Sequence, residues 1–149
     1  MIVLRITRGI AAHFPTRFPE WLMAWPAFLA GASFILQPGM FATSPSFSTI
    51  ERWATQPAWA CVVLVYAAIR LLALIVNGTF AGFRYSPHFR AAASLAGLWF
   101  WGQLCVGFTI SALTGGGAWL APVLLSTFVI AELVNLYRSA SDIGPASKR

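Results

Sequence analysis

The sequence predicts an all-α integral membrane protein, a bundle of four spanning helices with both termini on the cytoplasmic side. Of its 149 residues, 58% are hydrophobic and 9% charged, whereas about one quarter of a soluble domain is charged. The apolar residues form four long stretches between polar or glycine-rich breaks, and a hydrocarbon core of roughly 30 Å requires stretches of about 17 to 25 residues. The basic residues concentrate in alternate intervals between these stretches, as the positive-inside rule expects.

The first element is a short N-terminal amphipathic segment. Arg5, Arg8 and Arg17 alternate with apolar side chains at helical spacing, which suits the surface of an anionic membrane. A frayed cytoplasmic tail is the alternative, and both interpretations stay open. Because this region has no uninterrupted apolar core before a cleavage site, we expect no cleavable signal peptide.

The first span is predicted over residues 21–41. Residues 42–56 form the one substantial polar loop. Ser48 followed three residues later by Glu51 has the spacing of a capping box. It predicts a short surface helix that ends near Trp53.

Three further spans complete one membrane domain. The second is predicted over residues 57–76 and is broken by Asn77 and Gly78, while a Ser-Pro turn signal precedes the third. A glycine-rich hairpin separates the third from the fourth. The predicted ranges are 91–114 for the third span, 118–137 for the fourth and 139–149 for a polar tail.

Charge sets the orientation. With the N-terminus inside, Arg52 is the one basic residue placed outside. Arg70 lies near the inner side within a span, and the others are cytoplasmic: Arg5, Arg8, Arg17, Arg84, Arg90, Arg138, Lys148 and Arg149.

Two opposite charges lie inside spans at matching depth. The second and fourth spans run in the same direction, and Arg70 and Glu132 each lie about five or six residues before the inner end, roughly 9 Å deep for Arg70. A charged side chain within the membrane needs a partner of opposite charge, a water pocket or access to the interface. We therefore predict an ion pair between the two helices. Tyr66 and Asn135 lie one helical turn away and are expected to support it.

Two alternatives to this ion pair stay open. Arg70 could snorkel to the inner headgroups while Glu132 pairs with Arg138 or water. A proton relay or transport role would normally require more ionisable groups within the spans. Gln103 is the other strongly polar side chain near the midplane, and we expect it to form a hydrogen bond between helices.

Small residues four positions apart allow helices to approach closely in lipid. Three pairs have this spacing, and they serve internal packing or self-association, of which internal packing is favoured. The pairs are Ala27 with Gly31, Ala93 with Gly97, and Gly107 with Ser111.

The basic loop before the third span predicts a contact with lipid headgroups through Arg84, His88 and Arg90. The two histidines, His13 and His88, lie outside the spans, which argues against a bis-histidine haem. We find no phosphate loop, nucleophile elbow or metal-ligand spacing. The sequence therefore predicts no catalytic residue, metal or cofactor. The dispersed basic residues argue against a nucleic-acid partner.

One stretch is similar to a known group. "RYSPHFRAAASLAGLWFWGQL", residues 84–104, resembles the basic loop and following helix of small membrane proteins encoded by tailed phages and prophages. The matching residues are Arg84, Pro87, His88, Arg90 and Trp101. The resemblance implies a multi-pass protein of the bacterial inner membrane with a holin-like role.

The expected function is therefore non-enzymatic and depends on association within the bilayer. In the holin-like version, copies self-associate and permeabilise the membrane. In the alternative version, the chain is an accessory or scaffolding subunit of a larger membrane protein complex. A small transporter or channel subunit ranks third, because the predicted spans contain few polar side chains that could line a permeation path.

Overall fold

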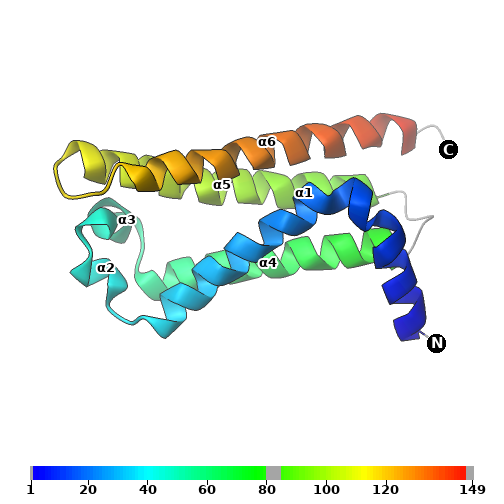
Figure 1. The fold of residues 1–149 in the computed structure, drawn as a ribbon, viewed down its shortest axis with the longest axis horizontal. Coiled ribbons are helices and arrows are strands. Elements are labelled where there is room, and N and C mark those ends of the chain that lie inside the picture. The colour runs from blue at the N-terminus through cyan, green and yellow to red at the C-terminus, as the bar shows by residue number, and fades with distance from the viewer. Residues whose placement is uncertain (1, 80–84, 147–149) are drawn as a thin grey trace.

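The computed structural model describes residues 2–79 and 85–146, which are mainly helical and contain no strand. Three short helices lie together at the end away from the chain termini (Figure 1): α2 (Met40–Thr43), the 3₁₀ helix η1 (Pro45–Phe47) and α3 (Ser48–Trp53). The predicted all-α class is confirmed. The long helices are α1 (Ile2–Leu36), α4 (Gln56–Thr79), α5 (Ser86–Leu113) and α6 (Leu120–Ala146).

Three helices in the described part of the chain are long and apolar enough to cross a membrane: α4, α5 and α6. They correspond to the second, third and fourth predicted spans. The helix α1 is not among them. Its uncharged part, Trp21 to Leu36, has 16 residues, which span about 24 Å and fall short of a hydrocarbon core of roughly 30 Å.

The predicted first span, 21–41, is not one helix. The helix α1 ends at Leu36, and Gly39 then adopts a φ of 78° before α2 begins. This left-handed conformation favours glycine, which has no Cβ. The predicted polar tail, 139–149, was also wrong in part, because α6 continues to Ala146.

The predicted amphipathic segment belongs to α1. The helix bends in its N-terminal part (Figure 1), in the stretch that contains Pro15 and Pro19. A proline inside a helix removes a backbone hydrogen bond and bends the axis. The bend turns the first residues of α1 across the end of the molecule, while the rest of α1 lies along α4.

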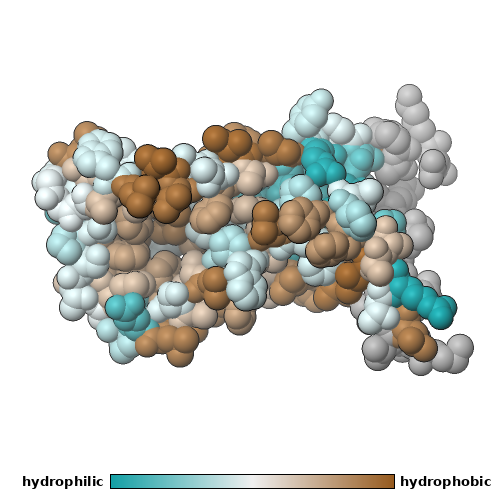
Figure 2. Space-filling model, viewed as in Figure 1, coloured by the Kyte–Doolittle hydropathy of each residue, from teal (hydrophilic) through white to brown (hydrophobic). Residues whose placement is uncertain are grey.

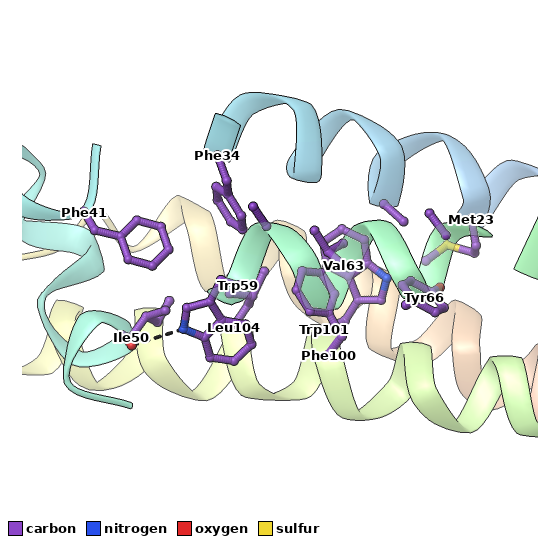
Figure 3. Close-up of a cluster of buried hydrophobic side chains, with 13 residues drawn as sticks. Met23, Phe34, Phe41, Ile50, Trp59, Val63, Tyr66, Phe100, Trp101 and Leu104 are labelled. Atoms are coloured by element: carbon purple, nitrogen blue, oxygen red, sulfur yellow. Dashed lines mark hydrogen bonds between the residues drawn. The ribbon is translucent and has the colours of Figure 1, made fainter. Parts of the chain in front are cut away.

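The long helices pack mainly as two pairs, α1 with α4 and α5 with α6, and α4 against α5 joins the pairs. Aromatic and aliphatic side chains fill the space between them (Figure 3), including Phe34, Trp59, Val63 and Phe100. The Trp59 indole N–H donates to the Ile50 carbonyl at 3.3 Å.

The predicted helix ending at Trp53 is present as α3, but the capping box is not formed. Phe47 is the N-cap residue and makes no side-chain cap bond. The Ser48 hydroxyl instead lies 3.3 Å from the Ser111 hydroxyl on α5. Packing of α3 against α5 therefore redirects the serine.

Candidate functional site

The Arg70 and Glu132 side chains meet in the interior, as the sequence predicted. Arg70 on α4 donates from Nη2 to Glu132 Oε2 on α6, and the two side chains are 2% and 0% exposed. The Tyr66 hydroxyl donates to the other oxygen, Glu132 Oε1, at 2.5 Å. Both carboxylate oxygens are thus bonded. The burial of Arg70 does not fit the snorkelling alternative.

Arg70 contacts all the long helices. Its Nη1 donates to the backbone carbonyl of Glu20 on α1 at 3.2 Å, and its Nη2 donates to the Ser94 hydroxyl on α5 at 3.4 Å. On its own helix, the guanidinium carbon lies 5.4 Å from the centre of the Tyr66 ring. With Glu132 on α6, this side chain ties together α1, α4, α5 and α6.

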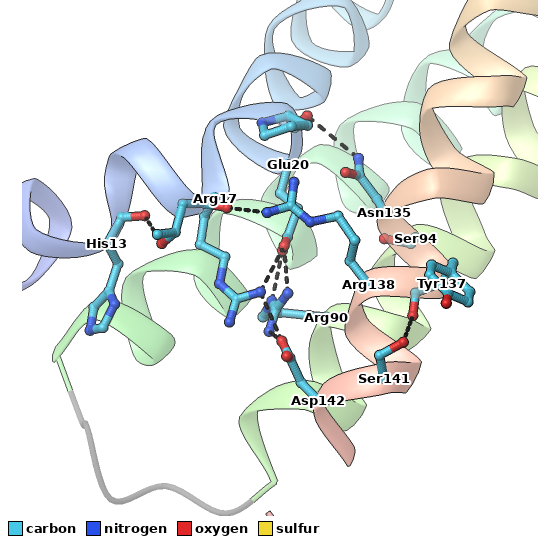
Figure 4. A network of polar contacts seen from close by, with 12 residues as sticks. His13, Arg17, Glu20, Arg90, Ser94, Asn135, Tyr137, Arg138, Ser141 and Asp142 are labelled. Atoms are coloured by element: carbon cyan, nitrogen blue, oxygen red, sulfur yellow. Dashed lines mark hydrogen bonds and ion pairs between the residues drawn. The ribbon is translucent and has the colours of Figure 1, made fainter. Parts of the chain in front are cut away.

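A second group of ions (Figure 4) adjoins the first at Glu20, whose backbone carbonyl accepts from Arg70. Arg90 on α5 makes a two-point contact with Glu20, from Nε at 2.7 Å and from Nη2 at 2.5 Å. Its Nη1 donates to Asp142 Oδ2 on α6 at 2.9 Å. Arg17 on α1 contacts Asp142 at 2.8 Å and Glu20 at 3.6 Å.

The predicted headgroup contact at Arg90 was wrong. Arg90 is 2% exposed and its guanidinium is held by two carboxylates within the chain. His88 is exposed at the start of α5, beside Tyr85 with ring centres 6.0 Å apart, and its headgroup role stays a prediction. Arg84 lies outside the described residues.

We call these two groups the charge cluster. It contains three arginines and three carboxylates: Arg17, Arg70, Arg90, Glu20, Glu132 and Asp142. The chain has four acidic residues in all, so three of them are in the cluster. Its formal charges cancel, which is how charges are accommodated where water is scarce.

Two further contacts attach α6 to the bent part of α1. The predicted supporting residue Asn135 donates from its amide to the Pro19 carbonyl at 3.4 Å. Arg138 donates to the Thr16 carbonyl at 2.5 Å. Both acceptors are backbone carbonyls in the stretch of α1 that contains Pro15 and Pro19, so these contacts hold α6 against the bend.

The predicted small residues pack within the chain. A Cβ at Gly31 would lie 2.5 Å from Leu64 Cδ2 on α4, and one at Gly107 would lie 2.5 Å from Ile50 Cγ1 on α3. Ala27 and Ala93 are buried. The Ser111 hydroxyl lies 3.0 Å from the Thr49 hydroxyl.

Gly97 has a more specific role at the charge cluster. A Cβ there would lie 2.5 Å from the Tyr66 hydroxyl and closer still to Glu132 Oε1. Glycine therefore permits the tyrosine and the carboxylate to meet against α5. Of the two interpretations of the small residues, internal packing is the one that these contacts match.

Described residues outside the cluster line two hollows of different size. The larger, about 640 Å³, lies between α1 and α4 near the short helices and is lined mainly by apolar side chains such as Phe34, Pro38 and Leu64. The smaller, about 160 Å³, lies between α4 and α5 and includes Gln103. Among the described residues, no group of three or more His, Cys, Asp or Glu side chains could hold a metal ion.

Sequence reasoning did not identify Arg17, Arg90, Glu20 or Asp142 as members of the cluster, nor Ser94 as a partner of Arg70. Glu20 was assigned to the region before the first span and Asp142 to the tail. The one signal in the sequence was the small number of acidic residues. With four acidic residues against ten basic ones, each acid that adjoins a span is a candidate partner for a buried arginine.

No family model matches the chain, and searches of curated proteins and of solved structures found no match. The arrangement of the charge cluster is therefore the basis for inferring function. Each of its carboxylates accepts from an arginine, and Glu132 also accepts from Tyr66, so the cluster joins helices through neutralised charges.

Proposed function

We propose that the protein is a non-enzymatic protein of the bacterial inner membrane that acts through lateral association in the bilayer. In this proposal α1, α4, α5 and α6 form a four-span bundle with both termini in the cytoplasm. The N-terminal part of α1 lies at the inner surface.

Charge supports this orientation. Both termini lie at one end of the molecule (Figure 1), and strongly hydrophilic residues concentrate at that end on the face in view (Figure 2). Arg8, Arg17 and Arg138 lie on the segments at that end, and Arg52 lies on α3 at the other. The positive-inside rule assigns the end rich in arginine to the cytoplasm.

The charge cluster supports α1 as the fourth span. Arg17 and Glu20 are the charges that shorten its apolar part, and both are neutralised by partners on α5 and α6. A charged side chain that is paired with an opposite charge and hydrogen-bonded costs less free energy near the membrane than an isolated one. Ala27 and Gly31 further fit α1 closely against α4.

The functional proposal depends mainly on the observation that the charged side chains of the cluster point into the bundle. The intramembrane charges are paired with one another in the charge cluster. The outer faces instead expose large apolar side chains, including Trp25, Leu72, Leu95, Ile130 and Tyr137. A protein built in this way offers its partners a rigid apolar surface. An accessory or scaffolding subunit uses such a surface.

The holin-like version receives less support. In that version small-residue faces join separate copies, and the intramembrane charges line or destabilise the lesion, whereas both are used within one chain. A transporter or channel also receives less support. The polar groups extend inward to Tyr66 and are then followed by the apolar cluster around Val63 and Phe100.

Inducible expression in a bacterium tests the proposal. Culture density and a membrane-potential dye are followed while the tagged protein is cross-linked in the membrane and purified. We expect an intact potential at high membrane abundance together with cross-linked species larger than the monomer. Prompt collapse of the potential would overturn the scaffolding version in favour of permeabilisation. A monomer without partners would overturn lateral association itself.

A further inference from the structure

Gln103 is a polar side chain that the charge cluster does not use. It lies ten residues before the end of α5 at Leu113, about 15 Å along the helix, which is the middle of a hydrocarbon core of roughly 30 Å. It is partly exposed, and it has no hydrogen bond to another described residue.

The surroundings of Gln103 are aromatic. It lines the smaller hollow with Trp53, Trp59 and Trp99. The rings of Trp59 and Trp99 are stacked with centres 6.0 Å apart, and the Trp59 N–H is already donated to Ile50. Acyl chains carry no hydrogen-bonding groups, and an unsatisfied polar group in lipid costs several kcal/mol. No described residue is a hydrogen-bond partner of this amide, so a polar group on a second molecule would satisfy it.

The face of α5 around Gln103 suits close approach of another helix. At 100° per residue, Ala92, Ala96, Trp99 and Ile110 lie within about 40° of Gln103, and all of them are exposed. Small residues at this spacing permit backbone contact between helices in lipid. This face is distinct from the inward one that holds Ala93 and Gly97.

We propose that two copies of the chain pair through this face of α5, with the Gln103 amides bonded to each other across a twofold axis. An amide carries both donors and an acceptor, so it is complementary to itself. A twofold interface places the same residue opposite itself. The face carries no charge that would repel a second copy. This inference rests on the proposed function, in which the partner for lateral association is a second copy of the chain.

Disulfide cross-linking tests the geometry in membranes. In a background of Cys61→Ser with Cys105→Ser, single substitutions Ala96→Cys and Ile110→Cys are compared with Ile130→Cys, a control on the exposed face of α6. We expect oxidation to produce dimers at Ala96→Cys and Ile110→Cys and not at the control. Equal cross-linking at the three positions would indicate random collision and overturn the proposal.

Energy transfer between labelled copies in vesicles tests the amide. Gln103→Leu should weaken the dimer roughly 3- to 30-fold, the range expected for hydrogen bonds between helices in membranes. Thr127→Leu, a polar-to-apolar control on the exposed α6 surface, should leave it unchanged. Because Gln103 has no hydrogen-bond partner within the described chain, its variant should retain the helical circular dichroism of the wild type.

The outcomes separate this inference from the function on which it rests. A wild-type monomer that still co-purifies with another membrane protein would overturn the twofold pairing and leave lateral association standing. A wild-type monomer with no lateral partner would overturn both. An unchanged dimer in Gln103→Leu would remove the amide from the interface.

Discussion

Arg70 and Glu20 join the two halves of the charge cluster. The Arg70 guanidinium donates to the backbone carbonyl of Glu20 at 3.2 Å, while the Glu20 carboxylate is held by Arg90. One residue of α1 therefore bridges an ion pair between α4 and α6 and another centred on α5. This relationship makes the cluster cooperative, because movement of α1 disturbs both ion pairs.

Removing one partner of the inner ion pair should destabilise the protein strongly. Arg70→Met leaves the Glu132 carboxylate buried without its cation, which costs about 3–5 kcal/mol. The double variant Arg70→Met with Glu132→Leu should recover much of this loss, because no uncompensated charge remains. Unfolding in detergent followed by circular dichroism measures both. A single variant as stable as the wild type would contradict the role of the ion pair.

Gly97 should tolerate no side chain. Gly97→Ala places a methyl group 2.5 Å from the Tyr66 hydroxyl, so the bond from Tyr66 to Glu132 must shift, and we expect a lower melting temperature. Gly102→Ala on the same helix is the matched control. Nothing lies within 4 Å of a Cβ there, and alanine favours a helix over glycine by about 1 kcal/mol. Equal melting temperatures for the two variants would contradict this packing.

Arg90 should not be replaceable by lysine. The planar guanidinium group of Arg90 contacts both carboxylate oxygens of Glu20 and also Asp142. The ammonium group of lysine cannot reproduce this planar geometry. We expect Arg90→Lys to lose roughly 1.5–3 kcal/mol, as for a hydrogen bond to a charged group. The same unfolding assay measures it, with the exposed neighbour His88→Gln as a control that should unfold like the wild type.

Topology can be tested with single cysteines. In the background without native cysteines, Arg52→Cys on α3 should react with an impermeant maleimide in intact cells, because this end faces outward in the proposed orientation. Ser141→Cys near the end of α6 should react only after permeabilisation. Both positions are exposed. The reverse labelling pattern would invert the orientation.

The sequence by itself determined the class and part of the site. Long apolar stretches predict helices, because a backbone in lipid must satisfy its own hydrogen bonds, and α4, α5 and α6 follow the predicted spans. The contact between Arg70 and Glu132 was also predictable. Two spans with the same direction place residues at equal distances from their inner ends at equal depth.

Only the tertiary structure decided the rest of the cluster. Glu20 reaches Arg90 from the part of α1 that follows the bend, and Asp142 joins them because α6 continues past its apolar part. Helical periodicity also does not reveal which of two neighbouring faces turns inward. Packing alone separates Ala93 and Gly97, which are buried, from Ala92 and Ala96, which are exposed, because burial depends on which helices meet.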